Sequence, residues 1–564
     1  MSLALQRLID AAQGRIPADL LLTDIEYLNV FSNQWRRGEI AICDGKIVGL
    51  ESGLQATRTY DGRGLRVVPG FIDAHVHVES SLLVPAYFEK AVLPRGTTSA
   101  ICDPHELANV QGVSGIQYFL DEAERLRMNL RVMLSSCVPA THLETNGGGI
   151  IDGEQLAPLL AHPRALGLAE MMNVPGVLHA DPAVLKKIAL FAHVPMDGHC
   201  PLVRGQQLSA YAAAGISSCH ESSQLEEAAE KLTKGIAVWI REGSVAKDLD
   251  ALVPLLNLAT STSLGFCTDD RNPLDIAREG HIDHLVRKSI RLGVAEEVAY
   301  RCASWSVARH YGLKQRGAIA PGYAADLVLL EDSRNVGIRD VLCGGKLVSE
   351  LELGRGAGAA SAHPSGQSVR AVAPAAHDLL GPSGQVHVIG VHPGSIITAR
   401  SVEAHDTPGV ARLSVLERYG RGSKPSNGYV RGFGDAFRGA IGSSVGHDSH
   451  NLIGVGGGAQ AGEDMRTSIA ALIAAGGGFC VVRDGQVRAL LPLPFGGLMS
   501  ERDPRDLEQD LRKLHHESHA IGCELPEPFL QLAFLSLPVI PSLKLTDRGL
   551  VDVDAFQFID VRAS

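Results

Sequence analysis

The sequence predicts an α/β protein built from a (β/α)8 TIM barrel, a small β-sandwich domain and a C-terminal α+β domain. Three observations lead to this prediction. Strand-like and helical stretches alternate about eight times in the middle of the chain. Two similar β-hairpin segments flank that middle section, and a long mixed segment follows them. At 564 residues the chain has room for two to four domains of roughly 100–200 residues each.

The first β-hairpin segment lies in residues 18–69. There ADLLLTDIEYLNV is followed by EIAICDGKIVGLES, in which Asp44-Gly45 separates two apolar runs. Asp-Gly at such a position is a strong hairpin signal. A matching segment, ADLVLLED and VLCGGKLVSE, follows the middle section and has Gly344-Gly345 at its turn. We therefore predict that residues 1–69 and 321–350 form one small β-sandwich domain on both sides of the barrel.

Residues 70–320 are predicted to form the barrel. Amphipathic stretches such as GVSGIQYFLDEAERLRM and SQLEEAAEKLTKG read as helices between buried strands. The strand-like runs are GFIDAHVHV, TTSAICD, NLRVMLSSCV, ALGLAEM, HVPMDGHC, GISSCHES, IAVWIREGS and TSLGFCTDD. Each run ends in polar residues, which is where a barrel of this kind carries its chemistry.

The rest of the chain is predicted to hold a linker and a further domain. Residues 351–375 are rich in Gly, Ala, Ser and Pro, which is typical of a linker. Residues 376–564 are predicted to form an α+β domain with helices near 460–475 and 504–520. Its strands are expected in VHVIGV, ARLSVLERY, GYVRGFG, GFCVVRDGQVRALLPL and KLTDRGLVDV.

Composition excludes several classes of protein. The net charge of −11 leaves no global basic field, which argues against a nucleic-acid partner. We find no apolar run of about 20 residues and no signal peptide, so we expect no membrane association and a cytoplasmic location. The ten cysteines form no C-x-x-C pair, and we expect free thiols rather than disulfides or a structural zinc site.

The motif that carries chemistry begins at PGFIDAHVH. Its two histidines, His75 and His77, stand two residues apart and therefore point to the same side of a strand. Imidazole is the commonest protein ligand for divalent metals of intermediate softness. In the first strand of a barrel this pair predicts a metal site. Asp73 fits either a role near that site or a simple strand-edge acid.

With this motif the chain resembles the amidohydrolase superfamily, and within it the adenine deaminases of bacteria. The resemblance spans nearly the whole chain. It is carried by HVHVESS, ICDPHELANV, GLAEMMN, DGHCP, SSCHES, CTDDR, SSVGHDSHN and LPVIPSLKLTDRGL. It implies a metal-dependent TIM barrel with a β-sandwich split in sequence around it.

The resemblance also implies a binuclear metal centre. Glu170 would replace the bridging carboxylated lysine of other members, since no lysine occurs nearby before Lys186. The second metal would take His199 and His220, and the first would take Asp269 beside His75 and His77. Asp270 is expected on the opposite side of an extended chain. Two divalent ions are therefore expected, with Mn favoured and Fe or Zn as alternatives.

Proton transfer in such a site needs more than the ligands. The resemblance implies that Asp269 accepts the proton of the attacking hydroxide. Protonation of purine N1 needs a further acid. The H-x-x-E stretch of related deaminases is His199-Cys200-Pro201-Leu202 here, without a glutamate. The remaining candidates for catalytic residues are Glu221, Asp103 and His105. Alternatively, these are polar loop residues at the barrel mouth without a catalytic role.

The implied reaction is hydrolytic deamination of adenine to hypoxanthine and ammonia by a metal-bound hydroxide, in purine salvage. The expected partners are adenine and water, and a homo-oligomer, dimer or larger, is expected. The alternative is a cyclic amide hydrolase of the dihydroorotase or hydantoinase type on the same barrel. Such an enzyme would usually carry the bridging lysine that this sequence lacks.

The C-terminal segment contains one further cluster of metal-ligand types. His447, Asp448 and His450 could bind a metal, reach the barrel mouth as an active-site cap, or form a hydrogen-bonded turn. Two other patterns are incomplete. GVGGG at 454–458 lacks the Lys-Ser/Thr of a P-loop, and HHESH at 515–519 is one residue short of H-E-x-x-H.

Overall fold

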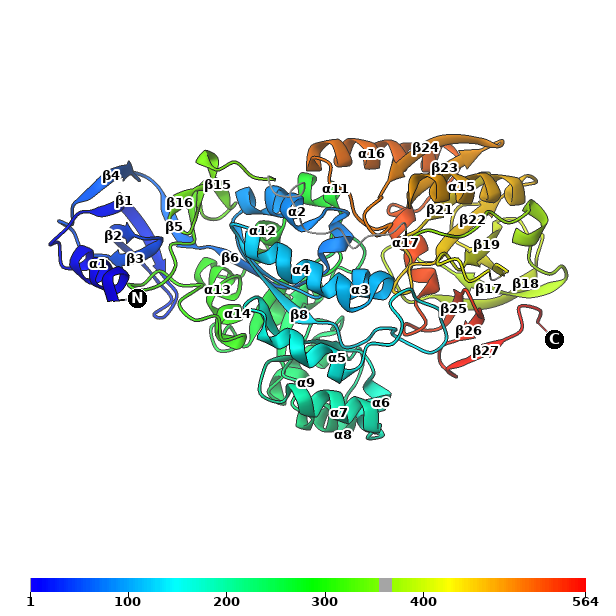
Figure 1. Ribbon diagram of the computed structural model, residues 1–564, viewed down its shortest axis with the longest axis horizontal. Coiled ribbons are helices and arrows are strands. Elements are labelled where there is room, and N and C mark those ends of the chain that lie inside the picture. Colours follow the sequence, from blue (N-terminus) through cyan, green and yellow to red (C-terminus); the bar gives the residue numbers. More distant parts are fainter. Residues whose placement is uncertain (1, 355–367, 423, 564) are drawn as a thin grey trace.

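The protein consists of a central barrel with one sheet attached at each end (Figure 1). The structure is a computed structural model that describes residues 2–354, 368–422 and 424–563. Residues 355–367, inside the predicted linker 351–375, lie outside the described residues. No helix in the described ranges is long and apolar enough to span a membrane.

The barrel has eight parallel strands, each hydrogen-bonded to the next one in the sequence. A parallel bridge between Val76 and Asp269 joins the last strand back to the first. The predicted (β/α)8 barrel is thus confirmed, with one strand in each predicted run. The strands are β6 (Phe71–Val76), β7 (Thr97–Cys102), β8 (Asn129–Leu134), β9 (Ala165–Met171), β10 (Met196–Gly198), β11 (Ser218–Cys219), β12 (Ala237–Arg241) and β13 (Leu264–Cys267).

Helices connect these strands along the outside of the barrel. The two stretches predicted as helices correspond to α4 (Val113–Arg125) and α9 (Leu225–Thr233), and both bury apolar residues. The other barrel helices are α2 (Pro85–Val92), α3 (His105–Gln111), α5 (Gly153–Leu156), α6 (Val174–Leu178), α7 (Pro182–Phe191), α8 (Gly205–Ala213), α10 (Leu249–Leu252), α11 (Pro273–Arg278), α12 (Ile282–Arg291), α13 (Glu296–Cys302) and α14 (Trp305–His310).

The N-terminal sheet is assembled from both sides of the barrel, because β14 pairs antiparallel with β5. Its two predicted hairpin turns are present, and all four of their residues have positive φ, from 49° at Asp44 to 76° at Gly345. Helix α1 (Ser2–Ala12) packs against it. The strands are β1 (Ala18–Asn29), β2 (Gln34–Cys43), β3 (Lys46–Gly49), β4 (Ala56–Asp61), β5 (Arg66–Pro69), β14 (Leu327–Asp332), β15 (Gly337–Cys343) and β16 (Lys346–Leu347).

The C-terminal sheet also has eight strands, in the order β18-β17-β20-β19-β22-β21-β23-β24. They are β17 (Gln385–Gly390), β18 (Ala399–Ala404), β19 (Val410–Leu416), β20 (Ser426–Arg431), β21 (Gly439–Ser443), β22 (Leu452–Gly457), β23 (Gly478–Arg483) and β24 (Gln486–Pro492). The predicted helices correspond to α15 (Ala461–Ala475) and α16 (Pro504–Ala520). After α17 (Pro528–Ala533), a small sheet holds β25 (Leu543–Thr546), β26 (Gly549–Asp552) and β27 (Gln557–Ile559).

The central strands β21 and β22 are absent from the sequence prediction because they are rich in glycine, which disfavours strands. Packing explains the glycines. A Cβ on Gly442 would lie 2.3 Å from Ser468 Oγ, and one on Gly456 would lie 2.9 Å from the carbonyl oxygen of Ala461. The glycines therefore let α15 lie directly on the sheet.

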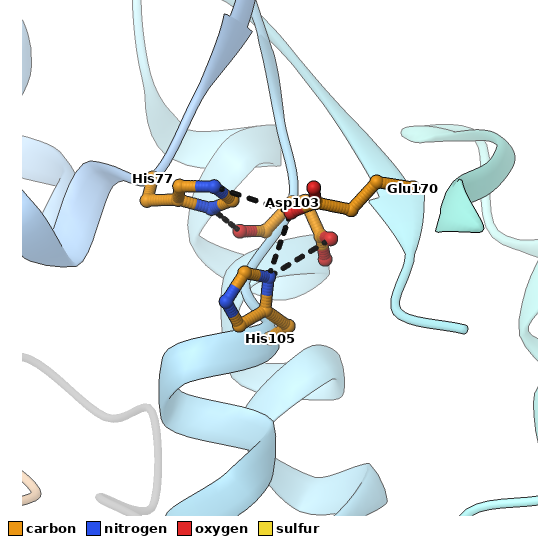
Figure 2. A group of neighbouring side chains, drawn as sticks. All are labelled: His77, Asp103, His105 and Glu170. Atoms are coloured by element: carbon orange, nitrogen blue, oxygen red, sulfur yellow. Dashed lines mark hydrogen bonds and ion pairs between the residues drawn. The ribbon is translucent and has the colours of Figure 1, made fainter. Parts of the chain in front are cut away.

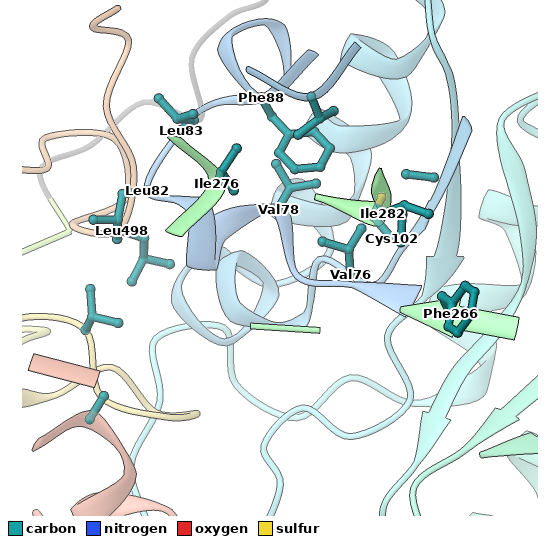
Figure 3. Packing of buried hydrophobic residues seen from close by; sticks show 14 of the residues in the cluster. Val76, Val78, Leu82, Leu83, Phe88, Cys102, Phe266, Ile276, Ile282 and Leu498 are labelled. Carbon is teal, nitrogen blue, oxygen red and sulfur yellow. The ribbon is translucent and has the colours of Figure 1, made fainter. Parts of the chain in front are cut away.

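The C-terminal part is joined to the barrel by an apolar core. Leu498 belongs to the same buried cluster as Leu82, Leu83 and Val76 of the barrel (Figure 3). Beside it, the backbone of Ser500 donates to the carbonyl oxygen of Leu82 at 2.8 Å. The mouth of the barrel is therefore held against the C-terminal sheet rather than open to solvent.

Candidate metal centre

The carboxyl ends of the barrel strands bring together all six predicted metal ligands. His75 lies in β6 and Glu170 in β9, and the other four follow their strands by one or two residues. Five of the six side chains are buried, and His199 retains 15% exposure. The six candidate ligands are His75, His77, Glu170, His199, His220 and Asp269.

Glu170 lies at the centre of this group. Its Oε1 is 3.3 Å from His77 Nε2 and 3.8 Å from His75 Nε2. Its Oε2 is 3.0 Å from His199 Nδ1 and 3.3 Å from His220 Nε2. Each carboxylate oxygen thus faces a different pair of the candidate ligand histidines, which is the arrangement that a carboxylate needs to bridge two cations; Oε1 also lies 3.1 Å from His105 Nδ1.

Asp269 completes the first of these two groups. Its Oδ1 lies 3.2 Å from His77 Nε2 and 3.6 Å from His75 Nε2. The backbone of Asp269 has φ of 54°, which breaks the alternation of an extended strand. The expectation that Asp270 points away is therefore wrong. Asp270 lines the same cavity and accepts a hydrogen bond from Ser80 Oγ at 2.5 Å.

The donor atoms fit divalent cations. His77 Nδ1 lies 3.0 Å from the carbonyl oxygen of Asp103, so this nitrogen carries the proton and Nε2 presents its lone pair. That lone pair meets oxygens of Glu170 and Asp269, an arrangement of acceptors that needs a cation between them. Among the described residues, Glu170 Oε1 and His199 Nε2 have no hydrogen-bond partner. Ligands about 2.1 Å from one ion lie roughly 3–3.5 Å apart. His77 Nε2 lies 3.3 Å from Glu170 Oε1 and 3.2 Å from Asp269 Oδ1, which agrees with that spacing.

The carboxylates of the site are held as anions. Burial alone would raise the pKa of Glu170, but the surrounding imidazoles of His105, His199, His220 and His77 hold this pKa well below its usual range. Burial likewise opposes ionisation of Asp269, whose pKa is held well below its usual range by His77, His220 and Arg241. Both side chains are therefore anionic ligands near neutral pH.

Arg241, at the end of β12, is a site residue that the sequence analysis missed. Its guanidinium pairs with both oxygens of Glu221, at 2.9 Å between Nη2 and Oε1, and with Asp269 Oδ2 at 3.0 Å. It also donates to Asp248 at 3.0 Å. Its position at the carboxyl end of a barrel strand was the signal available in the sequence. The arginine fixes Glu221 beside the metal ligands, 4.0 Å from His199 Nδ1.

The other two catalytic candidates differ in access to the cavity. Asp103 is enclosed, since Oδ1 accepts from Ser135 Oγ at 2.5 Å and Oδ2 lies 3.2 Å from His105 Nδ1. His105 lines the cavity, and its Nδ1 is also 3.1 Å from Glu170 Oε1. Figure 2 shows His105 pointing from the start of α3 toward Asp103 and Glu170. Asp103 therefore orients His105 rather than facing the cavity.

The loop between β21 and β22 supplies the C-terminal side of the cavity. His447 and Asp448 line it, whereas His450 is buried behind them. A second missed residue, Glu106, joins this loop to the barrel. His447 Nδ1 contacts its Oε1, and His450 Nε2 contacts its Oε2. Glu106 follows His105 in the CDPHE motif, and that position was its only signal.

An apolar wall from the C-terminal part also lines the cavity. It consists of Ile396, Phe534, Leu537 and Ile540. The cavity thus combines ionic side chains with flat and branched apolar side chains. Such a lining suits a small molecule that has both polar and apolar parts.

Comparison with known proteins places the chain among characterised families. Residues 66–348 match the amidohydrolase family, and residues 395–557 match the adenine deaminase C-terminal domain. The chain is 47% identical to an adenine deaminase of Cereibacter sphaeroides, over 99% of this chain and 100% of that protein. It is 48% identical to an adenine deaminase of Methylobacterium nodulans with the same coverage. An adenine deaminase of Brucella suis is 46% identical over 98% of this chain and 96% of its own length.

Proposed function

Because the chain belongs to the amidohydrolase family and, within it, to the adenine deaminases, we propose that it hydrolyses adenine to hypoxanthine and ammonia. The observation that carries the chemistry is the position of Glu170 between two groups of ligand atoms. The choice of adenine rests on full-length similarity to proteins with that name.

The ligand set supports two divalent ions. His75, His77 and Asp269 would hold one ion, His199 and His220 the other, and Glu170 would bridge them. All six donors are imidazole nitrogens or carboxylate oxygens without thiolate, for which we propose Mn, with Fe or Zn as alternatives. When bound, such ions supply a water of lowered pKa near neutral pH.

Asp269 is proposed to move the proton of the attacking water. Its Oδ1 faces the first ligand group, and its Oδ2 accepts from Arg241 at 3.0 Å. Held as an anion in this way, the carboxylate can accept a proton and then pass it to the leaving amine. Arg241 orients the carboxylate without occupying the oxygen that faces the site.

Glu221 is the side chain that we propose for proton transfer to purine N1. It is buried, lines the cavity and is fixed by Arg241 beside His199. His105 also borders the cavity but is engaged on its Nδ1 side by two carboxylates. Asp103 acts as a positioning residue because, unlike Glu221, it does not line the cavity and its oxygens engage Ser135 and His105.

The C-terminal part is proposed to cap the substrate. Phe534, Leu537 and the other apolar wall residues can cover one face of the purine and keep bulk water out. Excluding water strengthens the electrostatic interactions that stabilise charge developing on the ring. We therefore propose three parts with different roles. Residues 1–69 and 321–350 form a framework, residues 70–320 form the barrel that carries the reaction, and residues 376–564 form the cap.

The cellular setting that fits this reaction is purine salvage in the cytoplasm. Free adenine and water are the proposed reactants, with neither nucleic acid nor membrane as a partner. We propose a homo-oligomer, dimer or larger, as the working form.

Ammonia release from adenine by protein reconstituted with Mn²⁺ tests the proposal directly. Parallel assays with dihydroorotate and hydantoin measure opening of cyclic amides. We expect ammonia from adenine and no ring opening. Ring opening without deamination would replace the proposal by the cyclic amide hydrolase alternative.

A further inference from the structure

The two histidines proposed for the second metal ion follow the shortest strands of the barrel. β10 and β11 pair over two positions, the last of which joins Gly198 to Cys219. This ladder ends one residue before His199 and one residue before His220. The two imidazoles nevertheless lie 3.3 Å apart, between Nδ1 of His199 and Nε2 of His220. Contacts beyond the ladder must therefore hold the two loops at this separation.

A buried ion pair on α9 connects these two loops (Figure 1). Lys231 is fully buried and Glu227 is 1% exposed, and Nζ lies 2.8 Å from Oε1. The same Oε1 accepts from the backbone N–H of Leu202, in the loop after β10, at 2.8 Å. Lys231 in turn donates to the carbonyl oxygen of Glu221, in the loop after β11, at 2.6 Å. The pair thus spans both loops beyond the point where the strands part.

The ammonium group of Lys231 holds the backbone on both sides of His220. Besides its carboxylate partner and the carbonyl oxygen of Glu221, Nζ lies 2.9 Å from Ser222 Oγ. Three N–H donors therefore meet three oxygens. Nζ also lies 3.4 Å from the sulfur of Cys219, which ends β11. Because these neighbours precede and follow His220 in the sequence, the lysine fixes the segment that carries this histidine.

The loop after β10 depends on its polar contact because apolar packing contributes little there. Leu202 has φ of 59°, in the left-handed region that non-glycine residues rarely adopt. Its side chain is 52% exposed, so burial does not select this conformation. The hydrogen bond to Glu227 therefore stabilises the turn that follows His199.

The energetics of a buried ion pair favour a role other than net stability. Removing two charges from water costs about as much free energy as their attraction returns, so an apolar pair of similar volume would stabilise the fold equally well. An apolar pair could not, however, accept from Leu202 or donate to Glu221. The specific contribution of Lys231 and Glu227 is thus the position of these backbone atoms.

We propose that Lys231 and Glu227 are positioning residues that hold His199 and His220 at the separation that the second metal ion requires. This inference rests on the binuclear centre of the proposed function. Neither side chain of the pair lines the cavity, so both act through the two loops. Their loss should weaken binding of the second ion and leave the first ligand group intact.

Binding of Mn²⁺ to the full chain tests this role without an activity assay. Two Mn²⁺ ions that share a bridging carboxylate give a coupled paramagnetic resonance spectrum, which differs from the spectrum of a single ion. The variants are Lys231→Met and the double variant Lys231→Met/Glu227→Met. In both we expect the Kd of the second ion to rise at least about tenfold, so that the single-ion spectrum persists to higher Mn²⁺ concentration than in the parent protein.

The double variant separates positioning from folding. Lys231→Met alone leaves the Glu227 carboxylate buried without its cation, which destabilises the fold. In the double variant both charges are replaced by apolar side chains of similar size, and the melting temperature should return close to that of the parent protein. A melting temperature near that of the parent, together with a weakened second ion, is a result that a purely structural role does not produce.

Two further variants show whether the effect passes through the second ion. His199→Ala lacks a ligand of that ion, so adding Lys231→Met should change the Kd of the remaining ion by less than about twofold. Arg316→Met is the matched control, because it removes the cation beside another buried carboxylate, Asp326. The carbonyl oxygen of Asp326 accepts from Gly70, at the amino end of the barrel. Arg316→Met should give the coupled spectrum of the parent protein.

The outcomes distinguish this inference from the proposed function. A coupled pair in the parent protein with an unchanged Kd of the second ion in both methionine variants overturns the positioning role alone. Equal weakening of both ions also overturns it, because the pair would then support the barrel as a whole. Failure of the parent protein to bind a coupled pair would remove the binuclear centre and the proposed function, and the positioning role with them.

Discussion

The two sheets attached to the barrel differ in what they contribute to the site. Both have eight strands. The N-terminal sheet is continuous with the barrel through β5 and β6, yet none of its described residues lines the cavity. The C-terminal sheet supplies His447 and Asp448 from a loop, and the segments around it supply the apolar wall. Similar size therefore does not imply a similar role, because only one sheet lies against the carboxyl ends of the barrel strands.

The largest expected effect concerns the barrel ligands that the C-terminal part covers. Replacing Glu170 or any of the other five ligands by alanine should lower kcat/KM on adenine at least about a thousandfold, or roughly 4 kcal/mol. Bound metal should fall as well, while circular dichroism stays near that of the parent protein. Removing metal from the parent protein with a chelator should have the same effect on activity, reversed by Mn²⁺. Full activity in Glu170→Ala would remove its assignment as the bridging carboxylate.

A second prediction concerns substrate size and depends on the cap alone. Adenine should be deaminated at least about a hundredfold more efficiently than adenosine, judged by kcat/KM. The expected reason is that the wall of Ile396, Phe534, Leu537 and Ile540, which lines the cavity, leaves no room for a ribose attached to the base. Comparable values of kcat/KM for the base and the nucleoside would contradict the capping role.

The third prediction concerns the loop that joins the cap to the barrel. His447→Ala, Asp448→Ala and His450→Ala should each lower kcat/KM by at least about tenfold, or 1.4 kcal/mol. The two barrel ions should remain bound, as elemental analysis would show. Near-normal kinetics in all three variants would make the loop a structural turn and weaken the contrast between the two sheets.

The smallest expected effect on activity belongs to the N-terminal sheet. Leu22 of β1 is fully buried in the core of this sheet, away from the cavity. Leu22→Ala should lower the free energy of unfolding by about 2–5 kcal/mol. Measured well below the melting temperature, kcat/KM should change by less than about twofold. A loss of activity comparable to that of the loop variants would mean that this sheet also shapes the site.

The barrel and the side chains that meet at its carboxyl end could be predicted because each candidate ligand is a local feature of one strand. His75 and His77 alternate with apolar residues, and Glu170 ends an apolar run. Period-two patterning and the position of a residue at a strand end are visible in sequence. The same local reasoning predicted both hairpins of the N-terminal sheet, whose turns require residues that tolerate positive φ.

The sequence by itself therefore determined the barrel, the order of its strands and the candidate metal ligands that the strands carry. Only the tertiary structure decided which other groups meet those ligands. Glu106 belongs to the site because it contacts His447 and His450, more than 300 residues later in the chain. Arg241 belongs to it because it contacts Glu221 and Asp269, which follow other strands. The positive φ of Asp269, which turns Asp270 toward the cavity, likewise has no local signal. Such contacts depend on how distant segments pack against each other, and a sequence pattern within one segment does not predict that packing.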